Sequence, residues 1–204
     1  MPERYTLSSV DGLALAARYN IARGRDAPIS DAAGVRTARW GMLAPWRGHG
    51  GKRGANIYEA PVEAIAATPI LRDALRKRRC LVLADGFFGW RKIGKASQPY
   101  WIHPAPVRRL AFAGLCATHK DDDVLSFAIV VAPAAGAAAP FGGTMPVVVG
   151  DDWLASAEAA ERALAAPALD GWRADAVSTH VNAEDHDDPQ CIAPLGNPAQ
   201  GELF

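Results

Sequence analysis

Proline at position 2 is the residue whose type and place could give this chain unusual chemistry. A small second residue generally permits removal of the initiator methionine, which would leave a secondary amine at the N-terminus. Such an amine has a pKa well below that of a lysine side chain, so more of it is neutral near pH 7. A neutral amine attacks an aldehyde to form an iminium, the Schiff-base route of covalent catalysis. The alternative is that Pro2 is a tolerated residue without chemistry, and retention of Met1 would remove the amine hypothesis.

Cysteine and histidine do not form a metal-binding motif in this sequence. The three cysteines are far apart and no Cys-x-x-Cys pair exists. Cys80 and Cys116 lie in apolar runs, which is typical of inert core residues. Four histidines lack the spacing of metal ligands, namely His103, His119, His180 and His186. We therefore expect no metal and no other cofactor.

The net charge of zero hides a strong asymmetry along the chain. Residues 1–110 hold 19 Lys and Arg against 8 Asp and Glu, whereas residues 111–204 hold 3 against 14. A basic first half favours an anionic partner. The alternative is that the two halves pack together and partly neutralise each other.

The pattern of apolar residues predicts a β-rich domain. Short runs of β-branched and aromatic residues between residues 80 and 131 alternate with turn residues, which indicates strands. Thr68 and Pro69 mark the start of a helix, since Thr suits the cap and Pro the first turn. Other segments are interpreted as a strand running into a helix (6–19), a polar loop (22–34), a low-complexity loop (132–140) and an acidic helix (151–166). No βαβ alternation is visible, so we expect one α+β domain, residues 1–204, built on mostly antiparallel sheet.

The bulk composition is that of an ordinary globular chain, with 204 residues, 50% hydrophobic and 22% charged. No apolar run reaches the ~18 to 20 residues needed to span a bilayer. The first residues have no apolar stretch like that of a signal peptide. We expect a cytoplasmic protein without a membrane partner.

Several segments, in order from residue 4 to about residue 195, resemble motifs of one family. The longest is RDALRKRRCLVLADGFFGW, residues 72–90, which resembles RDAFRRRRCLVPADGFYEW. The other matches are Arg4-Tyr5, YNIA (19–22), WGML (40–43) with Trp46, Asn56, LAFAGL (110–115), MPV (145–147), VST and VN (177–182) and DDP (187–189). On these segments the chain is identified as a member of the SRAP family, the SOS response-associated peptidases. The resemblance implies the SRAP fold, with a β-rich core and a few short helices.

The resemblance also implies an unusual covalent mechanism. In SRAP proteins a Cys becomes the N-terminal residue, and its amine and thiol condense with the ring-opened sugar aldehyde of an abasic site in single-stranded DNA. The product is a stable thiazolidine crosslink. An Asn, a Glu and a His assist by positioning the sugar and moving protons, and the same Cys is implicated in autoproteolytic loss of the residues before it.

Most of these reactive positions are substituted in this chain. Pro2 stands at the position of the Cys, Gly89 at that of the Glu and Gly142 at that of the His, while Asn56 is retained. Proline has no thiol beside its amine, so the thiazolidine ring cannot close. Loss of the nucleophile together with groups that each contribute ~10² to 10⁴-fold should abolish the crosslink.

The DNA-binding surface that the resemblance implies is partly retained. Trp40 and Trp46 adjoin a Gly-rich basic loop, residues 44–56, and single-stranded DNA is bound by basic grooves with aromatic faces. Arginines at matching positions are Arg4, Arg72, Arg78 and Arg79. Arginine is lost at positions 58 and 144, which should weaken phosphate binding. The alternatives are core packing for the tryptophans and a solvated helix end for the arginines of 76–79.

These observations favour a DNA-damage-response protein that binds single-stranded or abasic DNA without crosslinking it. One alternative is that the Pro2 amine forms a Schiff base with abasic sites, with Glu3 or Glu59 as substitute proton donor or acceptor. Another is a protein-interaction domain with no DNA function. A peptidase acting on other proteins is disfavoured, because no Ser/His/Asp or Cys/His set can be assembled from the motif positions.

Overall fold

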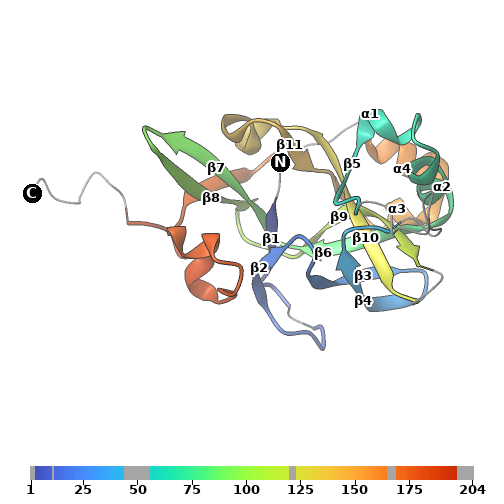
Figure 1. The fold of residues 1–204 in the computed structure, drawn as a ribbon, viewed down its shortest axis with the longest axis horizontal. Coiled ribbons are helices and arrows are strands. Elements are labelled where there is room, and N and C mark those ends of the chain that lie inside the picture. The colour runs from blue at the N-terminus through green and yellow to red at the C-terminus, as the bar shows by residue number, and fades with distance from the viewer. Residues whose placement is uncertain (1–2, 11, 44–55, 120–122, 165–168, 197–204) are drawn as a thin grey trace, which may run out of the picture.

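The strands of the chain form two sheets, and most of the pairs are antiparallel (Figure 1). The computed structural model describes residues 3–10, 12–43, 56–119, 123–164 and 169–196. The smaller sheet contains β1 (Arg4–Leu7), β2 (Arg18–Ala22), β7 (Gly86–Ile93), β8 (Ala96–Pro104) and β13 (Trp172–Ala176). The larger contains β3 (Asp26–Asp31), β4 (Gly34–Trp40), β5 (Glu59–Pro61), β6 (Arg79–Ala84), β9 (Leu110–Thr118), β10 (Leu125–Pro133), β11 (Thr144–Pro146) and β12 (Val148–Val149). The predicted α+β class with a mainly antiparallel core is confirmed.

Part of the larger sheet closes into a small barrel. Its strands follow one another in the order β10, β4, β3, β6 and β9, and β9 pairs again with β10. The pairs of β10 with β4 and with β5 are parallel. Because the sheet closes, each of these strands is hydrogen-bonded to a neighbour on both sides. The aromatic side chains that point into the barrel form its core.

The barrel strands β9 and β10 are buried on both faces. Phe112 and Phe127 point into the barrel core with Tyr5 and Trp40, whereas their neighbours in the strands, such as Ala113, join a second cluster under the helices. This alternation follows from the two-residue period of a strand. It explains why both strands are continuous apolar runs in the sequence.

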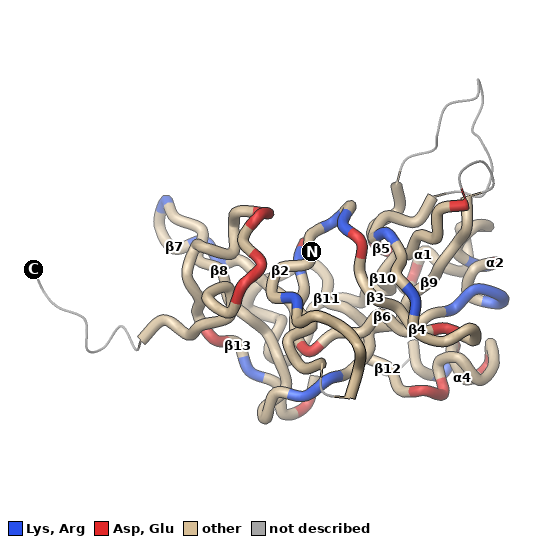
Figure 2. The backbone as a smooth tube through the Cα atoms, turned by 90° about the horizontal axis from the view of Figure 1, so that it is seen from below, with Lys and Arg blue, Asp and Glu red and all other residues tan. Residues whose placement is uncertain are grey.

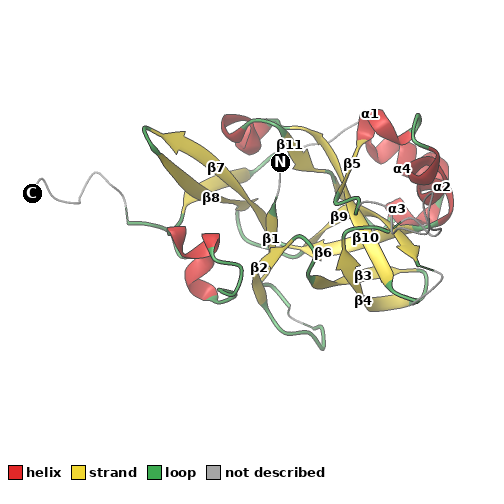
Figure 3. Cartoon of the chain, in the orientation of Figure 1, coloured by secondary structure: helices red, strands yellow, loops and turns green. Residues whose placement is uncertain are grey.

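Short helices cover the outer face of the barrel at one end of the molecule (Figure 3). They are α1 (Val62–Ile65), α2 (Pro69–Lys77), α3 (Asp152–Ala155) and α4 (Ala157–Leu164). The start of α2 lies as predicted, although Thr68 makes no side-chain cap hydrogen bond. No helix among the described residues has the length and apolar character needed to cross a membrane.

The β7–β8 hairpin and the C-terminal segment occupy the opposite end of the molecule (Figure 1). The C-terminal segment consists of two 3-10 helices, η3 (Thr179–Asn182) and η4 (Pro189–Ile192), and packs on the hairpin through a separate apolar cluster that includes Phe88 and Trp101. A further 3-10 helix, η2 (Gly136–Phe141), lies against β7.

Four predicted segments differ from the structure. The low-complexity segment 132–140 is not a plain loop, because it includes the end of β10 and most of η2. The acidic segment 151–166 is not one helix, because Ser156 is extended (φ −154°, ψ 167°) between α3 and α4. The described part of residues 6–19 contains no helix, because the expected cap residues have another partner: the backbone amides of Ser8 and Ser9 donate to the buried carboxylate of Asp85, each at 2.6 Å. The polar segment 22–34 is not a continuous loop but contains β3, in which Ala27 and Ile29 are buried. Two buried residues in six give too short an alternation to be recognised in the sequence.

Candidate functional site

A cavity of about 510 Å³ lies between the start of the chain, the β7–β8 hairpin, η2 and the C-terminal segment. Five of its wall residues are polar or charged on their side chains, and most of the others are apolar or aromatic. The residues that line it are Glu3, Arg4, Phe87, Phe88, Gly89, Trp90, Ser97, Ile102, Ala138, Phe141, Gly142, Thr144 and Asn182.

Strand pairing explains why the chain start reaches this cavity. Tyr5 of β1 pairs with Phe87 of β7 in an antiparallel register. Continuing that register places Arg4 opposite Phe88 and Glu3 opposite Gly89, and all four residues line the cavity. Glu3 and Arg4, the first residues that the structure describes, therefore form part of one wall of the cavity.

Gly89 faces the aromatic ring of Phe141 at very short range. A Cβ atom at position 89 would lie 2.8 Å from Cγ of Phe141 and 3.0 Å from Cδ1 of Ile102. Phe141 is itself packed on Tyr100, with 5.0 Å between ring centroids. The space in which a longer side chain at position 89 would begin is therefore filled from the opposite wall.

Gly142 has a backbone conformation that few other residues adopt. Its φ of 66° and ψ of −179° lie in a region populated essentially by glycine. Gly143 follows with a φ of 69°, and Thr144 then enters β11. A histidine at position 142 would cost on the order of 1 to 3 kcal/mol in backbone strain unless the loop changed its path.

Arg4 and Asn182 fix the C-terminal segment at the edge of the cavity. The guanidinium of Arg4 donates to Oδ1 of Asn20 and to the backbone carbonyl of Asn182, both at 3.1 Å. The Asn182 side chain accepts a hydrogen bond from Nε1 of Trp90 at 2.9 Å. Arg4 is only 9% exposed, so its charge serves mainly to hold this wall together.

The YNIA and DDP motif segments complete this attachment. Asn20 donates its side-chain amide to the backbone carbonyls of Val181, Ala183 and His186 at 2.7 to 3.1 Å. The carboxylate of Asp187 accepts from the backbone amide of Asn20 at 2.9 Å and also pairs with Arg18. These contacts give Asp187 of the DDP segment a structural role.

The cavity is poorly equipped for proton transfer. Among the described residues that line it, Glu3 and Arg4 are the only titratable ones, and the Arg4 guanidinium is engaged in the contacts above. Trp90 and Phe141 instead offer partly exposed aromatic surface. The arrangement suits binding of a sugar- or base-sized group rather than acid–base chemistry.

A profile of the family described as SOS response associated peptidase (SRAP) matches residues 3–184. The chain belongs to the SRAP family. It is 29% identical over 148 residues to the abasic site processing protein YoaM of Bacillus subtilis, covering 67% of this chain and 65% of YoaM. It is also 29% identical over 151 residues to the abasic site processing protein HMCES of Gallus gallus, covering 59% of this chain and 45% of HMCES. The chain thus spans less than two thirds of the length of these relatives.

A solved structure supports the fold. A phage-related protein from Bordetella bronchiseptica superposes with a TM-score of 0.69 and 22% identity, covering 86% of this chain and 93% of that protein. Gly89 and Gly142, which the resemblance aligns with the Glu and the His of the family, both line the cavity together with Thr144. Glycine provides no side chain at either of these two positions.

Asn56, the retained member of the SRAP reactive set, is not among the residues that line the cavity. It is exposed and donates from Nδ2 to the Tyr58 hydroxyl at 3.1 Å. Tyr58, at the position of an SRAP arginine, lies beneath the guanidinium of Arg23, 5.6 Å from its ring centroid. Of the two carboxylates considered as substitutes, Glu3 lines the cavity, whereas Glu59 pairs with Arg23.

Most residues predicted to contact DNA lie elsewhere. Trp40 has no exposed surface, stacks on Phe127 and donates to the Tyr58 carbonyl, so its prediction as a stacking platform is wrong in this structure. Pro2 and Trp46 lie outside the described residues.

The three predicted arginines downstream of residue 70 are on the helical side of the molecule. Arg79 donates to the carbonyls of Leu75, Arg76, Trp153 and Leu154, and Arg78 pairs with Asp73. Arg72 is exposed on α2 and donates to the Ala66 carbonyl at 3.3 Å. None of these three arginines is among the described residues that line the cavity. Arg78 and Arg79 instead stabilise the packing of the helices through the ion pair and hydrogen bonds above.

The residues that the sequence did not reveal are Trp90 and Phe141. Phe141 follows the low-complexity segment 132–140, which has no polar side chain. Trp90 lies in a run of apolar and aromatic residues, a setting typical of core packing. The only sequence signal for Phe141 is its place directly before two glycines, where a turn can direct a ring toward β7.

Placing a glutamate at position 89, as in the family motif, is expected to destabilise the fold. Gly89→Glu should lower the free energy of unfolding by about 1 to 3 kcal/mol, because its Cβ overlaps the Phe141 ring. Gly89→Glu combined with Phe141→Ala should recover part of that loss. Thermal unfolding of the two single variants and the double variant measures the coupling. Additive effects would show that Phe141 does not occupy the space of the missing side chain.

Proposed function

We propose that this protein binds abasic or single-stranded DNA reversibly, with one unpaired nucleotide or base-free sugar in the cavity. Two relatives are named abasic site processing proteins, and two positions that the resemblance aligns with the reactive set, Gly89 and Gly142, line this cavity. The proposal differs from the family mechanism in having no thiazolidine step, since Pro2 provides no thiol.

The observation that carries the proposal is the composition of the cavity walls. By the resemblance, glycine stands at two proton-transfer positions of the family, while Trp90 and Phe141 give partly exposed aromatic surface. Stacking of a base on an aromatic side chain is worth about 1 to 3 kcal/mol and needs no acid or base. The aromatic wall residues therefore favour binding of a base or sugar, whereas the glycines provide no group for acid–base catalysis.

Cations on the β7–β8 hairpin provide the electrostatic part of the proposed site. Arg91, Lys92 and Lys95 are exposed and follow Trp90 toward the tip of the hairpin. Figure 2 shows this tip at the end of the molecule opposite α2, which carries a second basic group. Phosphates next to the bound nucleotide would reach the hairpin cations, and each contact would add to the salt dependence of binding.

Equilibrium titration of a fluorescent single-stranded oligonucleotide, with and without one abasic site, tests the location. Arg91→Ala with Lys92→Ala should weaken binding and reduce the slope of log K against log salt by about 1.4, at roughly 0.7 per lost phosphate contact. The matched control is Arg72→Ala with Arg76→Ala on α2, which should leave the slope unchanged. A larger effect of the α2 pair would move the site away from the cavity.

A second candidate function is favoured by the position of Glu3. Glu3 lines the cavity and follows Pro2 directly in the sequence, so its carboxylate is a candidate to accept or supply a proton for a Schiff base between the Pro2 amine and a sugar aldehyde. Borohydride trapping separates the two candidates. A reduced adduct that is lost when the N-terminus is acetylated supports the amine route, and binding without any adduct supports reversible recognition. A heat-stable conjugate formed without reductant contradicts both, and no binding at low salt leaves an interaction domain without DNA function.

A further inference from the structure

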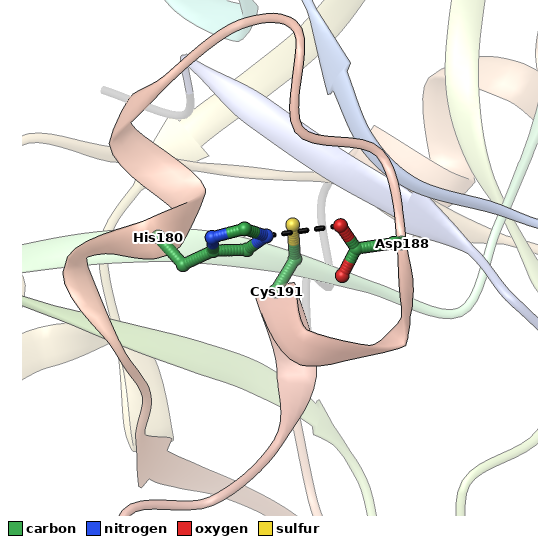
Figure 4. A group of neighbouring side chains, drawn as sticks. All are labelled: His180, Asp188 and Cys191. Carbon is green, nitrogen blue, oxygen red and sulfur yellow. Dashed lines mark hydrogen bonds and ion pairs between the residues drawn. The ribbon is translucent and has the colours of Figure 1, made fainter.

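The C-terminal segment brings together three side chains with different metal-binding atoms. They are His180 of η3, Asp188, which precedes η4, and Cys191 within η4 (Figure 4). One ligand atom of each residue lies within 4.8 Å of the other two. The spacing along the chain resembles no common metal motif, and the residues meet only because two short 3-10 turns fold the segment back on itself.

Several contacts hold the three side chains in place. The His180 ring stacks on His186 with 3.8 Å between centroids and an interplanar angle of 16°. The Asp188 carboxylate is oriented by the backbone amide of Gln190, which donates to Oδ1 at 2.8 Å. The backbone amide of Cys191 donates to the carbonyl of Asp188 at 3.0 Å. These contacts resemble the outer shell that fixes ligands at metal sites.

A catalytic role for this Cys, His and Asp set does not fit the structure. Cys191 has no exposed surface, so no substrate carbonyl could reach its sulfur. The side chains of His180 and Asp188 are 24% and 43% exposed. The group is therefore closed on the cysteine side and open to solvent on the side of the carboxylate.

We propose that His180, Asp188 and Cys191 form a three-residue zinc site. Thiolate, imidazole and carboxylate are the ligand types that Zn²⁺ takes, and a fourth position on the solvent side would hold water. Tetrahedral zinc keeps its ligand atoms about 3.3 to 3.6 Å apart, from its usual bond lengths. His180 Nε2 and Asp188 Oδ2 lie 2.9 Å apart in a hydrogen bond, so a modest separation would admit the ion.

The proposed ion would stabilise the wall of the cavity that contains Asn182. This role does not depend on the proposed function. Asn182 belongs to the same turn as His180, and it accepts from both Arg4 and Trp90. A bond network from η3 through zinc to η4 would fix the backbone that presents Asn182. The ion acts here as a structural clamp.

Isothermal titration of the tag-free chain with zinc chloride, after chelator treatment, tests the site. We expect one equivalent to bind, and Tm to rise by about 5 to 10 °C at zinc concentrations one hundred times Kd. Co²⁺ in place of zinc should give a thiolate-to-cobalt charge-transfer band. Cys191→Ser and Asp188→Asn should each weaken zinc binding by more than about a hundredfold, since even outer-shell changes cost about 10- to 100-fold.

Asp175→Asn is the matched control, because Asp175 forms another His–Asp pair, with His103 at 3.0 Å, that has no place in the proposed cluster. It should leave the zinc affinity unchanged. Circular dichroism of each metal-free variant checks that the fold is retained. Absence of zinc binding by the unmodified chain, or equal binding by the folded Cys191→Ser and Asp188→Asn variants, would overturn the proposal.

Discussion

Pro2→Cys is expected to give the protein a heat-stable conjugate with an abasic oligonucleotide, where the unmodified chain gives none. The substitution supplies a thiol on the carbon next to the terminal amine, so an aldehyde can be sealed as a thiazolidine. Glu3 lines the cavity, so the new nucleophile would be tethered beside the proposed sugar position at a high effective concentration. The reaction should remain slow, because the missing groups each contribute about 10² to 10⁴-fold.

Denaturing electrophoresis after heating measures the conjugate, and mass spectrometry verifies that Met1 has been removed. Pro2→Ser is the control, since it keeps a free amine and provides no thiol. A processed Pro2→Cys chain that binds abasic DNA yet forms no conjugate would show that the sugar lies away from the chain start. The cavity would then not be the binding site.

Asp85→Ala should produce the largest loss of stability among the substitutions considered. Asp85 is completely buried, and its carboxylate accepts from the Thr6 hydroxyl at 2.5 Å and from the Ser8 hydroxyl at 2.7 Å, besides the two backbone amides described above. Each buried donor left without a partner costs about 1 to 3 kcal/mol, so a total loss of about 3 to 5 kcal/mol is expected. Because 1 kcal/mol corresponds to about 2 to 4 °C at this size, Tm should fall by roughly 6 to 20 °C.

Thermal unfolding followed by circular dichroism measures this loss. Asp73→Ala is a suitable comparison, since Asp73 forms surface ion pairs with Lys77 and Arg78 on α2 and should leave Tm close to its original value. Equal shifts for the two variants would contradict the anchoring role of Asp85. A secondary effect is also expected, because Asp85 fixes Thr6, whose neighbours Arg4 and Glu3 line the cavity.

The sequence is sufficient to predict the central strands of the barrel but not the conformation of the segment that follows Leu7. β9 and β10 are continuous apolar runs with aromatic and β-branched residues, so their strand character is a local property. The segment after Leu7 depends on Asp85, which is far away in sequence, and Ser8 and Ser9 donate to it instead of capping a helix. Local patterns contain no information about such a partner.

The candidate site shows the same division. The motif positions 89 and 142 are readable from the sequence, and they do line one cavity. The role of the arginines could not be predicted from the sequence. Arg79 donates hydrogen bonds to carbonyls of α3, a contact between residues that are far apart in the sequence. Likewise, the sequence is compatible with two environments for a tryptophan beside a basic loop, a nucleic-acid base or the core. The structure places Trp40 in the core, stacked on Phe127.

The place of Glu3 in the cavity wall has a consequence for any polypeptide fused ahead of this chain. A leader, purification tag or upstream module would join the chain close to this wall and compete with a ligand for the space in front of it. Assays of nucleic-acid recognition therefore call for added sequences attached behind residue 204. The same geometry would make trimming of an N-terminal extension a means of exposing the pocket.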